Sequence, residues 1–544
     1  MSKVAKGAVH WADATAERIV RQRGERDCYV LAAGITPSGT VHFGNMREII
    51  TPELIARALR RTGYGVRFIY LWDDYDRFRK VPTNLPGDGW ERYIGAPLSE
   101  IPDPYGAAAS YARHFAGVFE EQMARLGIEP EWISQAEMYG GGAYAEGVRT
   151  ALRHRQRLRE LLDRQRTTPL AADWWPVEVY CACGAGAAGT AVLSWDGDYG
   201  LTYRCAACDA ERTADLRRGD GVKLGWRVDW PMRWAHHGVD FEAAGKDHHT
   251  AGGSWETAAP IAGEVFGRPP PATLKFDWIN VRGVGTMASS SGQLISPADA
   301  LAVYQPEVVR YLFARTRPDR EFEISFDLDV LKTYEDYDRA GRVGRGTEPA
   351  AEPRRIREGR AIELSEVDPD APLPAGQVEV SFRHLCSLLQ IHDGDIEGVV
   401  ASLLNGAAGS AAGSAAGDRL QDRARCAWHW ITTHAPEGFR FRLRDPGAPP
   451  VPVSAPVAAA VAGLRERLAS GRGPAGGDSS DAKAVNQAIY DVAAAHGMEA
   501  RELFAELYRV LIDQDRGPRL AEFILTIGVS RIDALLANVT ARDG

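Results

Sequence analysis

The chain lacks any long hydrophobic run. Across its 544 residues there is no stretch of roughly 18 consecutive apolar residues, so no helix is predicted to cross a membrane. The N-terminal segment, MSKVAKGAVHWADATAERIV, also lacks the apolar centre of a secretory signal. We therefore expect a cytoplasmic protein.

Cysteine is scarce, and there is no excess of positive charge. Of only seven cysteines, four form one cluster, which favours a reduced compartment with a metal site over a disulfide scaffold. The formal net charge is −9, so the chain as a whole is not a basic nucleic-acid binder, although a local basic face is enough to bind RNA. A chain of this length is too long for one core, and about two to four domains are expected.

A strand, a glycine-rich turn and a helix form the central motif. The apolar run Cys28–Ala33 is typical of a buried parallel strand. The sequence GITPSGTVHFGN follows over Gly34–Asn45, and the next residues repeat apolar side chains at helical spacing. Because the N-terminus of a helix carries unpaired N–H groups that suit phosphate, His42 and Asn45 are predicted to reach the same phosphate oxygens. The alternative is an ordinary strand-to-helix turn with His42 on the surface.

This turn resembles the HIGH element of the class I aminoacyl-tRNA synthetases, in the form found in the class I lysyl-tRNA synthetases. The resemblance rests on Pro-Ser-Gly-x-x-His-x-Gly-Asn. It implies that Gly34 and Thr36 contact the backbone of an amino acid. The residues that it assigns to ATP are Ser38, His42, Gly44 and Asn45.

A second predicted strand, Val66–Trp72, ends in the polar cluster DDYDRFRKVP. The carboxyl ends of strands in open α/β sheets face the ligand crevice, so Asp73 and Asp74, directly after this strand, are predicted pocket residues. Asp76 and Arg79 fit a salt-bridged loop equally well. The whole cluster resembles the corresponding segment of the class I lysyl-tRNA synthetases.

An insertion is predicted between about residues 80 and 220. Within it, Arg149–Arg166 is strongly basic. This run is either the solvated face of a helix or a surface that contacts RNA phosphates, which would make affinity strongly salt-dependent.

Four cysteines lie near the end of this insertion, in CACG (Cys181 and Cys183) and CAACD (Cys205 and Cys208). Two short pairs on either side of a predicted hairpin indicate a zinc ribbon over 180–210, with four thiolates around one structural zinc. Four free thiols are the alternative. A catalytic zinc is not expected, because no histidine accompanies the cysteines.

The segment that begins at Lys223 (KLGWRVDWPMRWAHHGVDFEAAGKDHHTAGGSW) resembles the second half of the class I lysyl-tRNA synthetase catalytic fold. A lysine side chain needs an apolar wall and a carboxylate for its ammonium. Trp226 or Trp230 with Asp229 can supply both, although tryptophans spaced four apart more often belong to a core. The resemblance assigns the lysine pocket to Asp229, Trp230 and His248. The further pocket residues are Asp247, Gly252 and Gly253.

The main departure from the family lies at 286–292, where the resemblance places a KMSKS-type loop. The sequence here is TMASSSG, without a lysine. The ATP-closing residues would be Met287, Ser289 and Ser290. Loss of one charge-stabilising donor costs roughly a hundred- to thousand-fold in rate, so we expect slow activation or another cation, such as Lys246, Arg282 or magnesium.

The α/β pattern ends at about residue 345, and the remainder, 346–544, is predicted to be helical with a flexible insert at 406–417. The last three predicted helices are Ala482–His496, Glu499–Asp513 and Arg519–Leu536. This region resembles the anticodon-binding domain of the family. The alternative is a helical oligomerisation or capping domain.

The predicted fold is thus an α/β, Rossmann-type class I synthetase catalytic domain (1–345) with an inserted zinc-ribbon-like subdomain, followed by an all-α anticodon-binding domain. The resemblance implies ATP-dependent activation of lysine and its transfer to tRNA(Lys), with ATP, Mg²⁺ and structural Zn²⁺, in a protein expected to be a monomer. The lysine-free loop motivates two other hypotheses. One is an enzyme that activates lysine or an analogue for a biosynthetic pathway. The other is a catalytically silent tRNA-binding protein.

Overall fold

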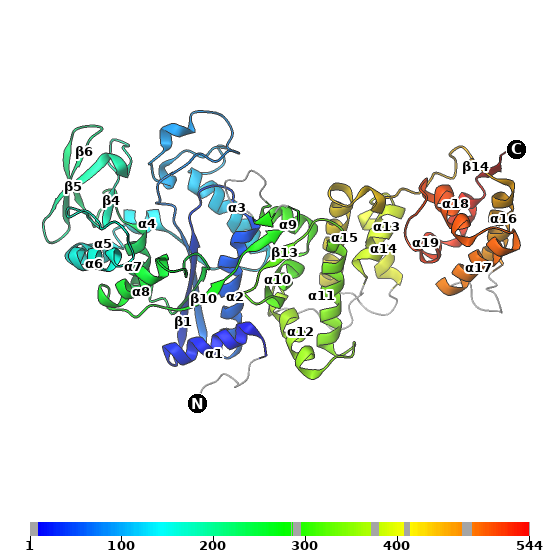
Figure 1. The fold of residues 1–544 in the computed structure, drawn as a ribbon, viewed down its shortest axis with the longest axis horizontal. Helices are drawn as coiled ribbons and strands as arrows, with labels where there is room; N and C mark the ends of the chain where they lie inside the picture. The colour runs from blue at the N-terminus through cyan, green and yellow to red at the C-terminus, as the bar shows by residue number, and fades with distance from the viewer. Residues whose placement is uncertain are drawn as a thin grey trace. The chain divides into compact units, whose positions relative to one another are not determined.

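The computed structural model describes residues 9–283, 285–286, 295–370, 380–406, 414–470 and 481–542. They form two compact units, which are considered separately (Figure 1). Unit 1 comprises Met1–Leu301, Pro306–Ile324 and Arg339–Pro372. Unit 2 comprises Ala302–Gln305, Ser325–Asp338 and Leu373–Gly544. The boundary predicted at residue 345 therefore lies inside a segment that belongs to unit 1.

A five-stranded parallel sheet forms the centre of unit 1, with strand order β10-β9-β1-β2-β3. The strands are β1 (Cys28–Ile35), β2 (Gly65–Trp72), β3 (Glu131–Ser134), β9 (Phe241–Gly245) and β10 (Ala272–Phe276). The chain builds the sheet outward from β1 to β3 and later returns to place β9 on the other side of β1. The order therefore reverses between β1 and β9, and a ligand crevice is expected at their carboxyl ends.

Helices cover this sheet, which explains why its strands are apolar on both faces. Helix α2 (Met46–Arg61) packs against β1, β2 and β9, and α1 (Trp11–Arg23) packs against α2. Helices α7 (Trp226–His237) and α8 (Ser254–Glu264) pack against each other. These elements confirm the predicted Rossmann-type fold and its strand–turn–helix motif.

The predicted insertion is two segments rather than one, because β3 pairs with β2 in between. The first segment carries η2 (Trp90–Tyr93), η3 (Leu98–Glu100) and α3 (Tyr111–Arg125). The second carries α4 (Gln135–Gly140), α5 (Ala145–Arg153), α6 (Arg155–Asp163), β4 (Val177–Val179), η4 (Ala187–Gly189), β5 (Thr190–Trp195), β6 (Gly200–Cys205), β7 (Glu211–Asp215) and β8 (Val222–Leu224). Strands β5, β6 and β7 form the small antiparallel sheet of the cysteine-bearing subdomain.

After β10 the chain forms a small sheet and a group of helices, of which α11 is shared between the two units. The strands are β11 (Ile279–Val281), β12 (Gly285–Thr286) and β13 (Phe322–Ile324). The helices are α9 (Pro297–Val303), α10 (Pro306–Arg315), α11 (Asp329–Arg345) and α12 (Glu352–Ser365). Helix α12 begins shortly after the boundary predicted at residue 345 and packs against α10.

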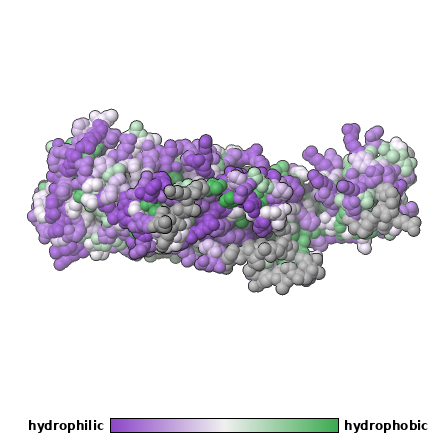
Figure 2. Space-filling view, turned by 90° about the horizontal axis from the view of Figure 1, so that it is seen from below, coloured by the Kyte–Doolittle hydropathy of each residue, from purple (hydrophilic) through white to green (hydrophobic). Residues whose placement is uncertain are grey.

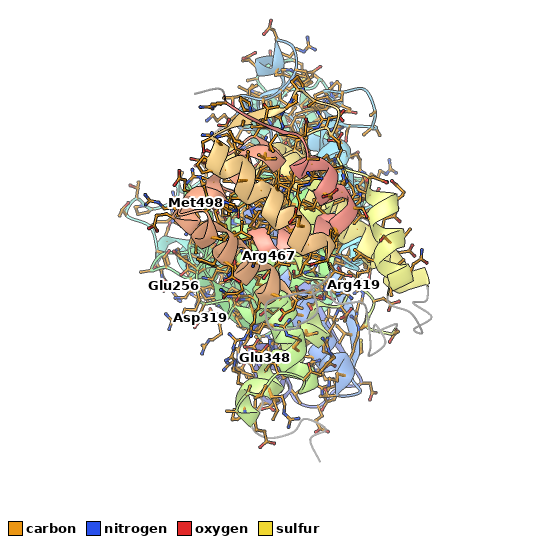
Figure 3. All side chains as sticks on the ribbon, turned by 90° about the vertical axis from the view of Figure 1, so that its right-hand side faces the viewer. Glu256, Asp319, Glu348, Arg419, Arg467 and Met498 are labelled. Atoms are coloured by element: carbon orange, nitrogen blue, oxygen red, sulfur yellow. The ribbon has the colours of Figure 1, made fainter. Side chains whose placement is uncertain are left out.

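Unit 2 is mainly helical, as predicted. Its elements after α11 are α13 (Phe382–Ile391), α14 (Ile396–Gly406), α15 (Ser414–Thr433), η5 (Glu437–Phe439), β14 (Val451–Val453), α16 (Ala455–Ala469), α17 (Ala482–Ala495), α18 (Ala500–Ile512), α19 (Leu520–Ile527), α20 (Val529–Leu536) and β15 (Val539–Ala541). In Figure 3, Arg467 marks α16 and Met498 marks the turn between α17 and α18. One predicted helix is two, because Gly528 adopts a φ of 89° between α19 and α20. Most of the predicted insert, 407–413, lies outside the described residues.

No helix among the described residues is long and apolar enough to cross a membrane. On the face shown in Figure 2, hydrophilic residues predominate.

A buried guanidinium holds three parts of unit 1 together. Arg310 on α10 is 0 % exposed. It donates to the Glu53 carboxylate on α2 (2.8 Å), to the Leu126 carbonyl (3.0 Å) and to the Leu364 carbonyl on α12 (2.9 Å). A buried charge is tolerated only when partners of this kind compensate for its lost hydration.

We expect Arg310→Met to lower the free energy of unfolding of unit 1 by about 3 kcal/mol or more, because two buried carbonyls lose their partner and the buried Glu53 carboxylate keeps only Arg57. Urea unfolding followed by fluorescence measures this. Arg317→Met is the control: its pair with Asp319 (2.9 Å) is exposed, so the change should be below about 1 kcal/mol. Equal effects of both substitutions would contradict the assigned role of Arg310.

Candidate functional site

The glycine-rich turn leaves β1 at the point where the strand order reverses. The turn ends in η1 (Phe43–Asn45), which runs directly into α2. The amide of His42 donates to the side-chain oxygen of Asn45 (3.3 Å), so these two residues are linked at the start of the helix. The turn therefore presents them together beside the end of the central strand.

The imidazole of His42 has an unsatisfied buried atom. Its Nδ1 is buried without a hydrogen-bond partner in the described part of the chain. Burial also lowers the pKa of His42, so the ring is neutral at pH 7. A buried polar atom without a partner is costly and is expected mainly where a ligand completes the hydrogen bond.

The two aspartates directly after β2 have different partners. Asp73 accepts from Nη1 of Arg233 on α7 (2.6 Å). Asp74 accepts from the Ser134 hydroxyl (2.5 Å) and the Ala136 amide (2.8 Å) at the start of α4. Asp74 therefore fixes a helix end, whereas Asp73 joins β2 to the helix that carries the tryptophans.

Asp76 connects the turn after β1 to the insertion. Its carboxylate accepts from the Thr36 hydroxyl (3.2 Å) and pairs with the buried ammonium of Lys223. Burial alone would raise the pKa of Asp76, but the Lys223 ammonium outweighs it and holds this pKa below its usual range. The position of Thr36 is thus set by a charged pair.

Asp229 is not a free carboxylate. It is 0 % exposed, forms an ion pair with Nε of Arg233 (3.3 Å) and accepts from the Tyr139 hydroxyl. Although burial opposes its charge, the carboxylates of Asp73 and Asp229 raise the pKa of Arg233. Asp229 thus helps to hold Arg233 within α7, and its direct contact with a lysine ammonium stays a prediction.

The tryptophans of α7 form a continuous wall. Trp226 stacks on Trp230 with ring centroids 5.1 Å apart, and Trp234 follows at 4.8 Å from Trp230. Glu242 on β9 accepts from the indole nitrogens of Trp230 (3.0 Å) and Trp234 (2.5 Å). Trp234 is a core residue, 1 % exposed. Trp226, Trp230, Glu242 and Gly34 line a cavity of about 20 Å³ at the end of β1.

Gly34 lines this cavity, and the close approach of β2 also requires a glycine here. A Cβ here would lie 2.3 Å from the carbonyl oxygen of Leu71 on β2. Gly253 is similarly constrained, because its Cβ would lie 2.4 Å from the carbonyl oxygen of His248. Both glycines are thus explained by close backbone approach.

His248 lies against the tryptophan wall, with its ring centroid 5.5 Å from that of Trp230. Its Nδ1 is 2.6 Å from the Ser254 hydroxyl at the start of α8. The neighbouring Asp247 carboxylate is 3.8 Å from Nε2 of His248 and is largely exposed. Gly252, with a φ of 76°, completes the turn before α8.

Two carboxylates near this wall, Glu48 and Glu242, escaped the sequence analysis. Glu48 lies in the first turn of α2, three residues after Asn45. Burial, together with the nearby carboxylates of Glu242 and Asp247, raises the pKa of Glu48 well above its usual range. The spacing after Asn45, almost one helical turn, is the signal that would have found it. A cation placed among these groups would relieve their repulsion.

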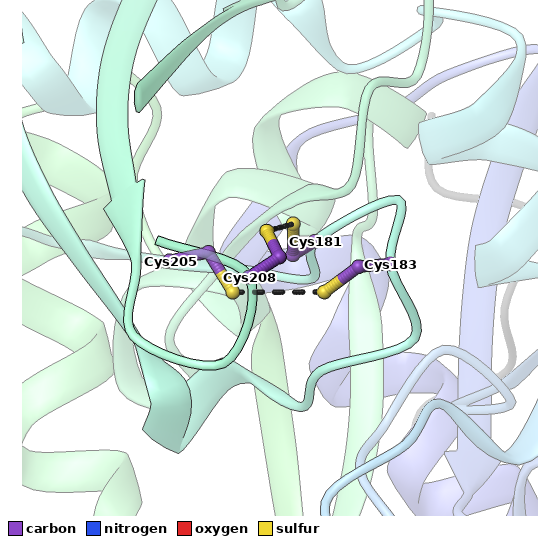
Figure 4. A group of neighbouring side chains, drawn as sticks. All are labelled: Cys181, Cys183, Cys205 and Cys208. Atoms are coloured by element: carbon purple, nitrogen blue, oxygen red, sulfur yellow. Dashed lines mark hydrogen bonds between the residues drawn. The ribbon is translucent and has the colours of Figure 1, made fainter. Parts of the chain in front are cut away.

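The four cysteines converge at one end of β6 (Figure 4). Their sulfur atoms all lie within 4.8 Å of one another. The Cys181 and Cys208 sulfurs are 3.9 Å apart, and those of Cys183 and Cys205 are 3.6 Å apart. Four thiolates at Zn–S distances of about 2.3 Å in a tetrahedron have sulfurs about 3.8 Å apart. The cluster can therefore hold a metal ion.

Comparison with known proteins identifies the family. Residues 9–367 match the family model described as tRNA synthetases class I (K). The chain is 42 % identical over 541 residues to a lysine–tRNA ligase of Treponema pallidum, covering 98 % of this chain and 99 % of the relative. The chain belongs to the class I lysyl-tRNA synthetase family. The chain is also similar to a lysine–tRNA ligase of Borreliella burgdorferi, with 40 % identity covering 97 % of this chain and 99 % of the relative. For a lysine–tRNA ligase of Pyrococcus furiosus the identity is 39 %, covering 95 % of this chain and 97 % of the relative.

Most residues that the family resemblance singled out lie around the carboxyl ends of β1, β2 and β9. The turn residues Gly34 to Asn45 and the wall of α7 are brought together there. Met287, Ser289 and Ser290 of the loop that departs from the family pattern lie outside the described residues. Of the two side chains suggested as a substitute cation, Lys246 is occupied, because it pairs with Asp277 and with Glu321 (3.2 Å).

The basic run Arg149–Arg166 is two helices, α5 and α6, and several of its charges have partners. Arg149 pairs with Glu146 and Asp198, both at 2.8 Å. Arg157 pairs with Glu160 (2.8 Å) and Glu264. These partners favour the interpretation as a structural, solvated face over a phosphate-binding surface.

We expect the purified chain to contain about one metal ion, because four thiols can complete a closed site. Cys205→Ser should abolish stoichiometric binding, measured by elemental analysis, since Cys205 is a buried member of the cluster. Cys28→Ser, outside the cluster on β1, is the matched control. Metal-free protein in which all four thiols react freely would contradict the site.

Proposed function

We propose that this chain is a lysine–tRNA ligase, which activates lysine with ATP and transfers it to tRNA(Lys). The observation that carries the proposal is the 42 % identity to a lysine–tRNA ligase over nearly the full length of both chains. The arrangement around β1 and β9 supports it, since it offers sites for a phosphate group and for a cationic side chain next to each other.

In the first step, the lysine carboxylate attacks the α-phosphorus of ATP, giving lysyl-adenylate and pyrophosphate. Chemistry of this kind needs alignment and charge stabilisation more than a protein nucleophile. We assign the phosphates to the turn: Ser38, Gly44 and Asn45 with backbone and side-chain donors, and His42 with its unsatisfied, neutral imidazole. Magnesium would accompany ATP as the partner of its phosphate oxygens.

The lysine side chain is assigned to the wall of α7. Trp226 and Trp230 can cover its methylenes, and the carboxylates of Glu48, Glu242 and Asp247 supply negative charge for its ammonium. His248, which lies against Trp230, would contact the lysine side chain from the same side. Asp73, Arg233 and Asp229 position the wall, and Gly34 and Thr36 lie where the backbone of the amino acid would meet the end of β1.

In the second step, a hydroxyl of the terminal ribose of tRNA attacks the lysyl carbonyl, and AMP leaves. We assign recognition of the anticodon to the helices of unit 2, in agreement with the family resemblance. The four cysteines would hold Zn²⁺, which supplies a structural cross-link for the β5–β7 subdomain.

We expect amino-acid-dependent ATP–pyrophosphate exchange with lysine, and much less with ornithine or arginine, measured with and without tRNA. His42→Ala should lower the rate by roughly 100-fold or more, because a preorganised donor to the reacting phosphate is lost. His392→Ala, an exposed histidine of unit 2, is the control. Absence of exchange under all conditions, with tRNA binding retained, would replace this proposal by the silent tRNA-binding alternative.

Helix α12 is a better candidate for contact with tRNA than the basic run of α5 and α6. It exposes Arg354, Arg355 and Arg357. The carboxylate of Glu358 is 3.7 Å from the guanidinium of Arg354 and 3.9 Å from that of Arg357. Exposed cations with few partners are free to displace counterions from an RNA backbone.

Replacing Arg153, Arg155 and Arg157 together by glutamine should therefore leave the salt dependence of tRNA affinity unchanged. The same replacement at Arg354, Arg355 and Arg357 should reduce its slope by about one for each RNA phosphate that is no longer neutralised. Filter binding over a range of salt concentrations measures both. A flatter slope in the first variant alone would assign the RNA surface to α5 and α6.

A further inference from the structure

The loop that the family resemblance assigns to ATP carries no positively charged residue. The segment 284–294 contains neither lysine nor arginine. Negative charge builds on pyrophosphate as it leaves, and stabilising that charge is the largest single contribution a protein makes to such a reaction. A cation other than a lysine of this loop is therefore required if activation is to be fast.

A cavity of about 420 Å³ opens directly beside the turn. One wall is the turn itself, from Ile35 to Asn45, and the opposite wall is the segment that follows β2. The charged residues of that second wall are Asp76, Arg77, Arg79 and Lys80. The cavity is thus bounded by backbone and side-chain donors on one side and by cations on the other.

The backbone that carries these cations is held in place. Phe78 pairs with the chain at Gly95 and Ala96 through two backbone hydrogen bonds of 2.9 and 2.7 Å. Its side chain is 1 % exposed and packs on Tyr111, with ring centroids 5.3 Å apart. Successive residues of an extended segment point to opposite sides, so burial of Phe78 directs Arg77 and Arg79 away from that core.

The same core is joined to the phosphate turn. The hydroxyl of Tyr111 donates to the carbonyl of Ser38 (2.8 Å). The two walls of the cavity are therefore connected through Tyr111, which packs on Phe78 of one wall and donates to Ser38 of the other.

The positive charge of the cavity is not neutralised internally. Within the described part of the chain, Arg77 and Lys80 have no ion pair, and Arg79 has only a 4.0 Å contact with Asp76. Asp76 in turn is already paired with Lys223. In contrast, Lys246, which directly follows β9, has two carboxylate partners.

We propose that Arg79 and Lys80 bind the β- and γ-phosphates of ATP and stabilise the charge on departing pyrophosphate, in place of the lysines that 286–292 lacks. Arg77 adds to the potential of the cavity. The inference rests on the proposed function for its reaction, although the site itself is one for a polyphosphate. It concerns a fixed segment after β2, which the family's loop does not include.

The test compares Lys80→Ala, Arg79→Ala and the double variant with Arg92→Ala, an exposed arginine of the same segment that does not line the cavity. In lysine-dependent exchange with and without tRNA, kcat should fall by roughly 10- to 100-fold in each single variant. This is less than for a buried donor, because both side chains are exposed and screened. KM for ATP should change much less, since the charge develops in the transition state. Lys80→Arg should restore most of the rate.

A double-mutant cycle distinguishes replacement of the loop lysine from a structural effect. Thr286→Lys should increase kcat more in the Lys80→Ala background than in the unmodified chain, because one cation then substitutes for the other. Equal gains in both backgrounds, or rates of Lys80→Ala and Arg79→Ala like that of Arg92→Ala, would overturn the proposal.

Binding of inorganic pyrophosphate, measured by calorimetry, separates this inference from the proposed function. Loss of pyrophosphate affinity in the double variant, in a chain that shows no exchange with any amino acid, would refute the ligase and support the polyphosphate site. Normal exchange and pyrophosphate binding, with impaired transfer to tRNA alone, would overturn the inference and assign the cavity to the 3′ end of tRNA.

Discussion

The buried guanidinium of Arg233 is the contact on which the candidate site depends. It joins Asp73 at the end of β2 to Asp229 within α7, at 2.6 and 3.3 Å. Removing one member of such a group leaves an uncompensated buried charge, which costs about 3–5 kcal/mol. Because Trp226 and Trp230 lie on the same helix, this ion pair also fixes the distance between the tryptophan wall and the carboxyl ends of the strands.

The sequence predicted the local elements of the fold well. The apolar runs before Gly34 and before Asp73 became β1 and β2, and the helix after Asn45 became α2. These elements follow from residues that are neighbours in the chain, through periodicity and turn chemistry. Family resemblance added the order of the domains.

The partners of charged side chains could not be predicted in this way. Arg233 and Asp73 are 160 residues apart, and no local pattern shows that Asp229 is already neutralised. For the same reason the sequence could not show whether the basic run of α5 and α6 binds RNA, because its partners Asp198 and Glu264 are distant in the chain. The division of the last predicted helix at Gly528 was missed because a single glycine in a helical pattern usually only weakens the helix.

The hydrogen bonds that hold Phe78 to Gly95 and Ala96 determine when in the reaction the positive potential is present. They make the positive potential beside the turn a permanent property of the resting protein, instead of one delivered after ATP has bound. A permanent potential attracts polyphosphate from solution at all times. The same attraction retains the leaving pyrophosphate. Fast capture of ATP would therefore be accompanied by slow release of the first product.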